Sequence, residues 1–166
     1  MQPIELYRGA LAGTKQSFIA AHPTPFLMYS GGALREVKSS DPALMTIDRF
    51  VVEGQRAPSR VADVFVAAIT PREAGEVIVT IGTNPTCDIE INDTSVSKQH
   101  AWFQKSSDGW QLWDNDSVGG TRVNDEVLQT GHPHLLASGD VITLGYVELT
   151  FLTSDAFYSV VKHLAR

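Results

Sequence analysis

The sequence predicts an all-β fold for most of the chain, with helical segments near its two ends. From Val61 to Phe151, short runs of valine, isoleucine and aromatic residues alternate with turn residues, a spacing typical of a β-sandwich or barrel. Asp108-Gly109, between two tryptophan-bearing runs, is a strong hairpin signal because both residues tolerate positive φ. After Ser154 the apolar spacing changes to that of a helix. These observations favour one β domain with smaller additions at its ends.

The first sixty residues differ from the rest and carry too little apolar sequence for a core of their own. Thr14 predicts the N-cap of a short helix that ends at Pro23. Residues 26–29 predict a strand, and a further strand is expected around residues 47–52. This mixed α/β segment is expected to pack on the β domain.

The tail has the pattern of an amphipathic helix. Ser154 is the predicted N-cap, and Phe157, Val161 and Leu164 line one face. Packing back on the β domain is the simpler interpretation of that face, and binding to a partner is the alternative. The predicted organisation is an N-terminal extension at 1–60, a β domain at 61–153 and a C-terminal helix at 154–166.

Composition excludes several classes of protein. The chain has 166 residues, 43% hydrophobic and 19% charged, which suits one globular domain with an appendage. A net charge of -6 argues against general nucleic-acid binding, which needs a basic footprint. The single cysteine, Cys87, excludes an internal disulfide and is expected to be an inert, partly buried thiol. No secretory leader or membrane span is apparent, so a cytoplasmic location without membrane contact is expected.

Three polar loops between predicted strands carry the residues with the most specific pattern. They contain Gly82-Thr83-Asn84, then Ser97-Lys98-Gln99-His100, then Ser117-Val118-Gly119-Gly120-Thr121, and Gly139-Asp140 and Gly145 follow in the closing strands. Their order and spacing resemble those of the forkhead-associated (FHA) domain, a β-sandwich family that recognises phosphothreonine in partner proteins. The resemblance implies an FHA-like two-sheet β-sandwich and a protein-interaction module.

The resemblance also implies a role for each loop position. In the family, an arginine after the first glycine, and a serine with a following basic residue, hold the phosphate. An asparagine in the third loop holds the peptide main chain. Here Ser97 and Lys98 occupy the second-loop positions, whereas Thr83 stands in place of the arginine and Gly119 in place of the asparagine. The implied phosphopeptide-binding residues are Thr83, Asn84, Ser97, Lys98, Ser117, Gly119, Gly120 and Thr121, with Gly82 and His100 supporting the loops.

The two departures weaken the expected phosphate site. Lysine is a point charge and does not replace the bidentate fork of arginine. Losing one partner of such a charged pair costs about 2–5 kcal/mol. Arg122 is an alternative cation, although strand alternation leaves open whether its side chain points to the loops. With two partners missing, Ser97 is alternatively a hydroxyl that only braces its loop.

Other residues have simpler interpretations than chemistry. His100 has no cluster of paired ligands, so a loop-bracing role is favoured over catalysis or metal binding. Asp114, Asp116 and Asp125 have a spacing that fits no calcium loop, and no metal or cofactor is expected. The tryptophans at 102, 110 and 113 lie on strands, which favours packing over base stacking. No nucleophile–base pair, P-loop or dinucleotide fingerprint is present, so no enzymatic activity is expected.

Two hypotheses for function follow. The leading one is binding of a phosphothreonine-containing partner protein, weakly or atypically, in kinase signalling or in a larger assembly. The alternative is a phospho-independent adaptor or scaffold that uses a sheet face, an edge strand or the N-terminal extension. Thr14, Thr24 and Thr46 lie in that extension, which leaves open an intramolecular or homotypic contact.

Overall fold

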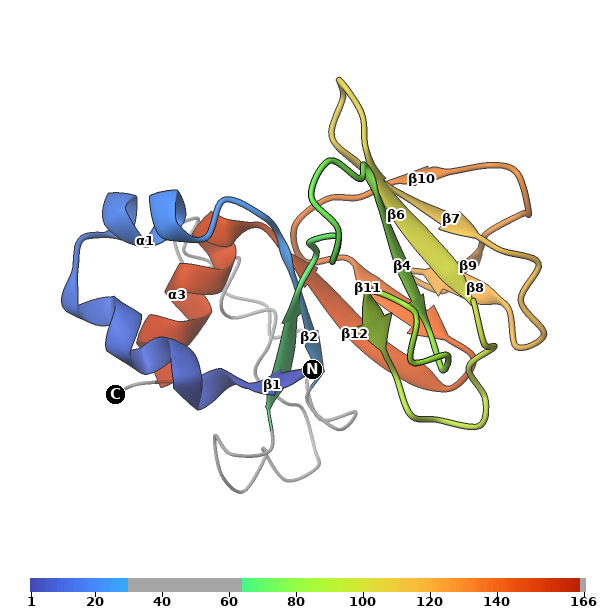
Figure 1. The fold of residues 1–166 in the computed structure, drawn as a ribbon, viewed down its shortest axis with the longest axis horizontal. Coiled ribbons are helices and arrows are strands. Elements are labelled where there is room, and N and C mark those ends of the chain that lie inside the picture. The colour runs from blue at the N-terminus through green and yellow to red at the C-terminus, as the bar shows by residue number, and fades with distance from the viewer. Residues whose placement is uncertain (30–63, 165–166) are drawn as a thin grey trace. The chain divides into compact units, whose positions relative to one another are not determined.

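The computed structural model describes residues 1–29 and 64–164, and the chain divides into two compact units (Figure 1). The first, called the sandwich unit, comprises Ile69–Phe151 together with Met1. The second, called the terminal unit, comprises Gln2–Ala68 and Leu152–Arg166. The predicted strand at residues 47–52 and the predicted boundary at residue 60 lie outside the described residues.

The first sheet of the sandwich unit has the strand order β10-β7-β6-β4-β5. Its strands are β4 (Ile78–Gly82), β5 (Ile89–Glu90), β6 (Ala101–Lys105), β7 (Trp110–Asp114) and β10 (His134–Leu135). Val79 pairs with Phe103, and Phe103 with Leu112, and all three side chains are fully buried. Trp102 and Trp113 are also cross-strand partners, with stacked rings 5.8 Å apart. Since side chains alternate along a strand, the two sets lie on opposite faces of the sheet.

The second sheet of the sandwich unit contains the order β12-β11-β8-β9. These strands are β8 (Thr121–Val123), β9 (Glu126–Val127), β11 (Val141–Leu144) and β12 (Val147–Leu152). Ile142 pairs with Val123 on one side and Leu149 on the other, and all three are buried. The predicted two-sheet β-sandwich is therefore confirmed.

The hairpin predicted at Asp108-Gly109 is present, with a longer connection than the dipeptide alone indicates. Lys105 pairs with Trp110, so four residues connect β6 to β7. Gly109 has a φ of 140°, whereas Asp108 is not among the residues with positive φ. Only the glycine therefore uses the conformational freedom on which the prediction relied.

The terminal unit combines segments from both ends of the chain. Its elements are β1 (Gln2–Pro3), a 3₁₀ helix η1 (Ile4–Ala12), α1 (Lys15–Ala21), β2 (Phe26–Tyr29), β3 (Phe65–Ala68) and α3 (Ser154–Leu164). Strand β3 pairs antiparallel with both β1 and β2. Thr14 caps α1 as predicted, since its hydroxyl accepts a hydrogen bond from the Ser17 N–H at 3.1 Å.

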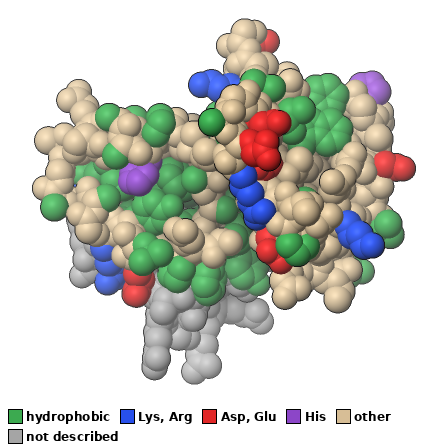
Figure 2. All heavy atoms as spheres, viewed as in Figure 1, with side chains coloured by type: hydrophobic (Ala, Val, Ile, Leu, Met, Phe, Trp, Pro, Cys, Tyr) green, Lys and Arg blue, Asp and Glu red, His purple; other side chains and the backbone are tan. Residues whose placement is uncertain are grey.

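Aromatic side chains dominate the core of the terminal unit. Phe26 of β2 and Phe157 of α3 stack with ring centroids 3.9 Å apart, and both are fully buried. Phe18 packs beside Phe157 at 6.1 Å, and Tyr7 meets Phe157 edge-on at 5.0 Å. Figure 2 shows further hydrophobic side chains gathered around a histidine on this unit. The N-terminal residues acquire a core because α3 supplies the apolar surface that they lack on their own.

The C-terminal helix is confirmed, but its predicted N-cap is wrong by one residue. The Ala156 N–H donates to the Thr153 hydroxyl at 3.4 Å, while the Ser154 hydroxyl donates to the His22 carbonyl at 2.5 Å. Ser154 is therefore engaged by the tertiary structure. None of the helices in residues 1–29 and 64–164 is long and apolar enough to cross a bilayer.

Replacing Phe157 by alanine is expected to lower the free energy of unfolding by about 3–5 kcal/mol, because the ring is fully buried and leaves a cavity. Far-ultraviolet circular dichroism during chemical denaturation is the measurement, since the described helices all belong to the terminal unit. Leu6→Ala is the matched control, because Leu6 is 66% exposed on η1. A loss no larger than that of the control would contradict the assigned core.

Candidate functional site

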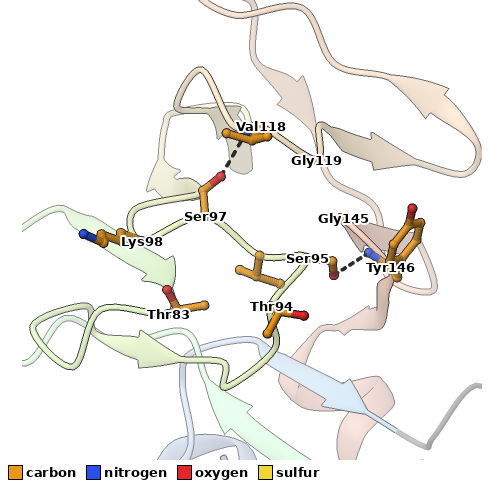
Figure 3. A pocket seen from close by; sticks show the side chains of 10 residues that line it. Thr83, Thr94, Ser95, Ser97, Lys98, Val118, Gly119, Gly145 and Tyr146 are labelled. Atoms are coloured by element: carbon orange, nitrogen blue, oxygen red, sulfur yellow. Dashed lines mark hydrogen bonds between the residues drawn. The ribbon is translucent and has the colours of Figure 1, made fainter.

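Four loops at one end of the sandwich unit line an open hollow of about 540 Å³ (Figure 3). They connect β4 to β5, β5 to β6, β7 to β8 and β11 to β12, and are called here the first to fourth loops of the apex. The lining residues are Thr83, Thr94, Ser95, Val96, Ser97, Lys98, Val118, Gly119, Gly145 and Tyr146. The hollow therefore joins segments from both sheets of the sandwich.

Main-chain contacts hold the first loop against the second. The N–H groups of Thr83 and Asn84 donate to the carbonyls of Ser97 and Lys98, at 3.1 and 3.0 Å. A Cβ on Gly82 would overlap the Lys98 carbonyl, so the chain needs glycine there. The position of the Ser97–Lys98 segment is thus fixed by backbone packing.

His100 joins the second loop to the third. Its imidazole is fully buried; Nδ1 accepts a hydrogen bond from the Ser97 N–H at 2.9 Å, and Nε2 lies 3.1 Å from the Gly120 carbonyl. Because Nδ1 is an acceptor here and Gly120 offers only an oxygen, the ring is neutral with its proton on Nε2. Burial lowers the pKa of His100, against the opposing effects of the Gly120 carbonyl and the Asp114 carboxylate.

The buried Asp114 holds the third loop in place through hydrogen bonds. It is only 4% exposed and accepts hydrogen bonds from the hydroxyls of Ser117 and Thr121 at 2.6 and 2.5 Å. Burial tends to raise the pKa of Asp114, but these bonds outweigh it and hold the pKa below its ordinary value. The hydroxyl protons of Ser117 and Thr121 are thus bound by Asp114 and are not available to a ligand. Within the described part of the chain, no group of three or more His, Cys, Asp or Glu side chains is placed to hold a metal ion.

Hydroxyl groups face the rim of the hollow. The Ser97 hydroxyl accepts from the Val118 N–H at 3.0 Å, which leaves its own proton for a further acceptor. The Ser95 hydroxyl accepts from the Tyr146 N–H at 2.9 Å and donates to Asp93 at 2.6 Å. In Figure 3 the Lys98 side chain extends from the rim, away from Ser95. It is exposed, so the ammonium is free to swing on its flexible stem.

Close packing explains the glycine in the third loop. A Cβ on Gly119 would lie 2.7 Å from the Ser95 carbonyl oxygen and 2.9 Å from the Gly145 Cα. An asparagine at this position has no room unless the second or fourth loop moves. The absence of a side chain at Gly119 therefore allows the second and fourth loops to pack directly against the third loop.

Sequence reasoning missed the fourth loop as part of the site. Tyr146 is 91% exposed, and it lines the hollow together with Val118, which is 98% exposed. Gly145 marked this hairpin in the sequence, and its φ is 61°. Nothing local indicated that Tyr146 would lie beside the third loop, because that proximity comes from the pairing of β11 with β8.

Four of the eight predicted binding residues line the hollow, namely Thr83, Ser97, Lys98 and Gly119. The other four, Asn84, Ser117, Gly120 and Thr121, are not among its lining residues. The Asn84 side chain accepts from the Thr86 N–H at 3.1 Å. Arg122 is exposed on β8 between two buried neighbours and does not line the hollow.

Comparisons with known proteins find similarity over part of the chain. The FHA domain family model matches residues 79–145. The glycogen accumulation regulator GarA of Mycobacterium tuberculosis is 35% identical over 78 residues, covering 47% of this chain and 46% of GarA. An oxoglutarate dehydrogenase inhibitor of Corynebacterium jeikeium is 37% identical over 74 residues, covering 45% and 49%. The chain thus spans about half the length of the curated relatives it matches.

Solved structures give similar partial matches. The FHA domain of FhaA, in complex with the intracellular domain of Rv3910, is 32% identical with a TM-score of 0.42, over 48% of this chain and 84% of that one. EmbR of Mycobacterium tuberculosis, in complex with a low-affinity phosphopeptide, is 26% identical with a TM-score of 0.43, over 46% and 20%.

The free energy of unfolding is expected to decrease as the pH falls below about 6.5, because the folded chain keeps His100 neutral while the unfolded chain binds a proton there. The contribution is fully present above that pH and is lost towards the lower pKa of the folded state. His100→Gln, which does not titrate, should flatten this dependence, as measured by denaturation at several pH values. An equal slope in wild type and His100→Gln would contradict the neutral buried ring.

Proposed function

Because this chain contains a forkhead-associated domain, a module of protein interaction, we propose that its apex binds phosphothreonine-containing segments of partner proteins. The observation that carries the proposal is that a hydroxyl, on Ser97, and a cation, on the adjacent Lys98, both lie at the rim of an open hollow. A phosphate group needs hydroxyl or amide donors and at least one cation. The second loop supplies a hydroxyl and a cation on adjacent residues.

The geometry around Ser97 suits donation to a phosphate oxygen. Its oxygen is held by the Val118 N–H at 3.0 Å, and its backbone N–H is engaged by His100 at 2.9 Å. The hydroxyl is therefore oriented before a ligand arrives, so little side-chain entropy is lost on binding. Thr83, across the hollow, adds a second hydroxyl (Figure 3).

The proposed binding is weak compared with a site that has an arginine. Thr83 provides no positive charge, and the loss of one charged partner corresponds to about 2–5 kcal/mol. Gly119 provides no side chain to hold a peptide main chain, and a net hydrogen bond adds about 1 kcal/mol. Lys98 must also turn towards the ligand from the position it has in Figure 3. These terms favour a weak, transient contact.

The relatives support a regulatory partner. The two curated relatives described above are named for regulating glycogen accumulation and for inhibiting oxoglutarate dehydrogenase. Both names describe control of another process by the protein concerned. By extension, the partner of this chain is a protein, and its effect is exerted through binding and without catalysis.

A second candidate function is phospho-independent binding by the same unit. The observation that favours it is the exposure of Val118 and Tyr146, at 98% and 91%, on the rim of the hollow. These two side chains offer a bound segment contact area that does not depend on phosphate. An adaptor of this kind would bind equally well with and without phosphate on the partner.

Titration with a degenerate phosphothreonine peptide library, followed by NMR, tests the proposed function. Shifts are expected at Thr83, Ser97, Lys98 and Val118 with the phosphorylated library and not with the unphosphorylated one. Ser97→Ala should weaken binding about tenfold or more, the equivalent of a hydrogen bond to a charged group. Equal shifts with both libraries would favour the phospho-independent adaptor instead.

Ser107→Ala is the matched control for this titration. Ser107 is exposed in the β6–β7 turn, and its hydroxyl donates to Asp108 at 3.2 Å. The turn is at the end of β6 that is far from the apex, because β6 begins after the second loop and runs away from it. Binding should be unchanged in this variant, and its spectrum separates loss of the ligand contact from general loss of a hydroxyl.

Thr83→Arg is expected to tighten binding of the phosphothreonine library by about tenfold or more, because it adds a bidentate, charge-assisted partner at the first loop. The apparent Kd from the same titration is the measurement. Unchanged affinity would show that phosphate does not sit beside Thr83. Gly119→Asn is expected to lower stability without this gain, since its Cβ would lie 2.7 Å from the Ser95 carbonyl oxygen.

A further inference from the structure

The hollow has little positive charge. Of its ten lining residues, Lys98 is the one with a charged side chain at neutral pH. Arg122, the cation considered from the sequence, is exposed on β8 and does not line the hollow. The other polar side chains that line the hollow carry hydroxyl groups; they belong to Thr83, Thr94, Ser95, Ser97 and Tyr146. The available charge is therefore +1, set in a chain whose net charge is -6.

A charge of this size matches a carboxylate as well as a phosphate. Phosphothreonine carries about -1.5 to -2 charges and three strong acceptor oxygens. A glutamate or aspartate side chain carries one charge and two acceptor oxygens. With Lys98 as the cation and the Ser97 hydroxyl as the donor, the carboxylate is neutralised, whereas the second charge of the phosphate has no partner. In an open hollow this second charge stays hydrated and gains little from the protein, which removes most of the advantage of phosphate.

The orientation of Lys98 does not alter this comparison. Its side chain extends away from the hollow in Figure 3, so it must turn towards either anion. The cost of turning is the same for both ligands and cancels in the ratio of their affinities.

The rim adds contacts that do not depend on phosphate. Val118 and Tyr146 are almost fully exposed, and the Tyr146 backbone is fixed by the Ser95 hydroxyl at 2.9 Å. Ser95 is itself held by the Asp93 carboxylate through its hydroxyl and its N–H, at 2.6 and 2.9 Å. An apolar side chain of a bound segment can therefore pack on a rim whose position is set in advance.

We infer that the apex accepts a glutamate or aspartate side chain of a partner segment at the position proposed for phosphothreonine, with an apolar neighbour against Val118 and Tyr146. An acidic segment of this kind binds without any phosphorylation. The inference rests on the proposed function, because it concerns the ligand of the same hollow. The site would then bind acidic segments, and replacing the acidic residue by phosphothreonine would raise the affinity only modestly.

The test uses four degenerate peptide libraries that share their flanking positions and differ only in a fixed central residue. The central residue is phosphothreonine, glutamate, glutamine or threonine. Chemical shifts of the intact chain give an apparent Kd for each library. Glutamate is expected to bind within about tenfold of phosphothreonine, and at least about tenfold more tightly than its neutral isostere glutamine.

Each outcome separates the two proposals. Binding of phosphothreonine, with glutamate no better than glutamine, overturns the inference and leaves the proposed function standing. Binding of glutamate without phosphothreonine overturns the proposed phosphate recognition and supports the inference. Equal binding of all four libraries, or of none, overturns both.

Two variants sharpen the test. Lys98→Gln should weaken binding of the glutamate library about tenfold or more, whereas Lys105→Gln, at an exposed lysine at the far end of β6, should not. Thr83→Arg should raise the preference for phosphothreonine over glutamate by about tenfold, because the added cation pairs with the second charge of the phosphate, which a carboxylate lacks. An unchanged preference in Thr83→Arg would contradict the charge argument.

Discussion

The apex depends on one neutral imidazole. His100 accepts a hydrogen bond from the Ser97 N–H and donates another to the Gly120 carbonyl, so the buried ring links the second loop to the third from the interior. A protonated ring would carry N–H groups on both nitrogens and lose the bond to Ser97. Beneath it, Asp114 fixes the third loop through hydroxyl donors. The geometry of the surface hollow is thus maintained by hydrogen bonds in the interior.

Backbone packing completes this framework and leaves the ligand-facing side chains free to differ. Gly82 and Gly119 allow neighbouring loops to approach through main-chain atoms, with no side chain between them. The loop positions therefore depend on the main chain of Thr83 and Lys98 and not on their side chains. The side chains at the rim of the hollow can therefore differ without a change of the two-sheet fold. Chemical selectivity at the rim and stability of the fold are set by different atoms.

The fold could be predicted from the sequence because its signals are local. Alternating apolar residues marked the strands, and Thr14 marked the start of α1. The interior of the site was harder to predict. Ser117 and Thr121 have hydroxyls that turn inward to Asp114, and sequence spacing does not tell which way a loop side chain points. Tyr146 joins the hollow only through strand pairing across the second sheet, which no local pattern indicates.

In the terminal unit, the N-terminal residues and α3 bury each other's apolar side chains. Phe26 near one end and Phe157 near the other stack on each other, and the Ser154 hydroxyl donates to the His22 carbonyl. Removal of either segment would therefore expose to solvent the apolar side chains of the other, which would favour aggregation. The first 29 residues and α3 therefore depend on each other for burial, although His22 and Ser154, which join them, lie 132 positions apart in the sequence.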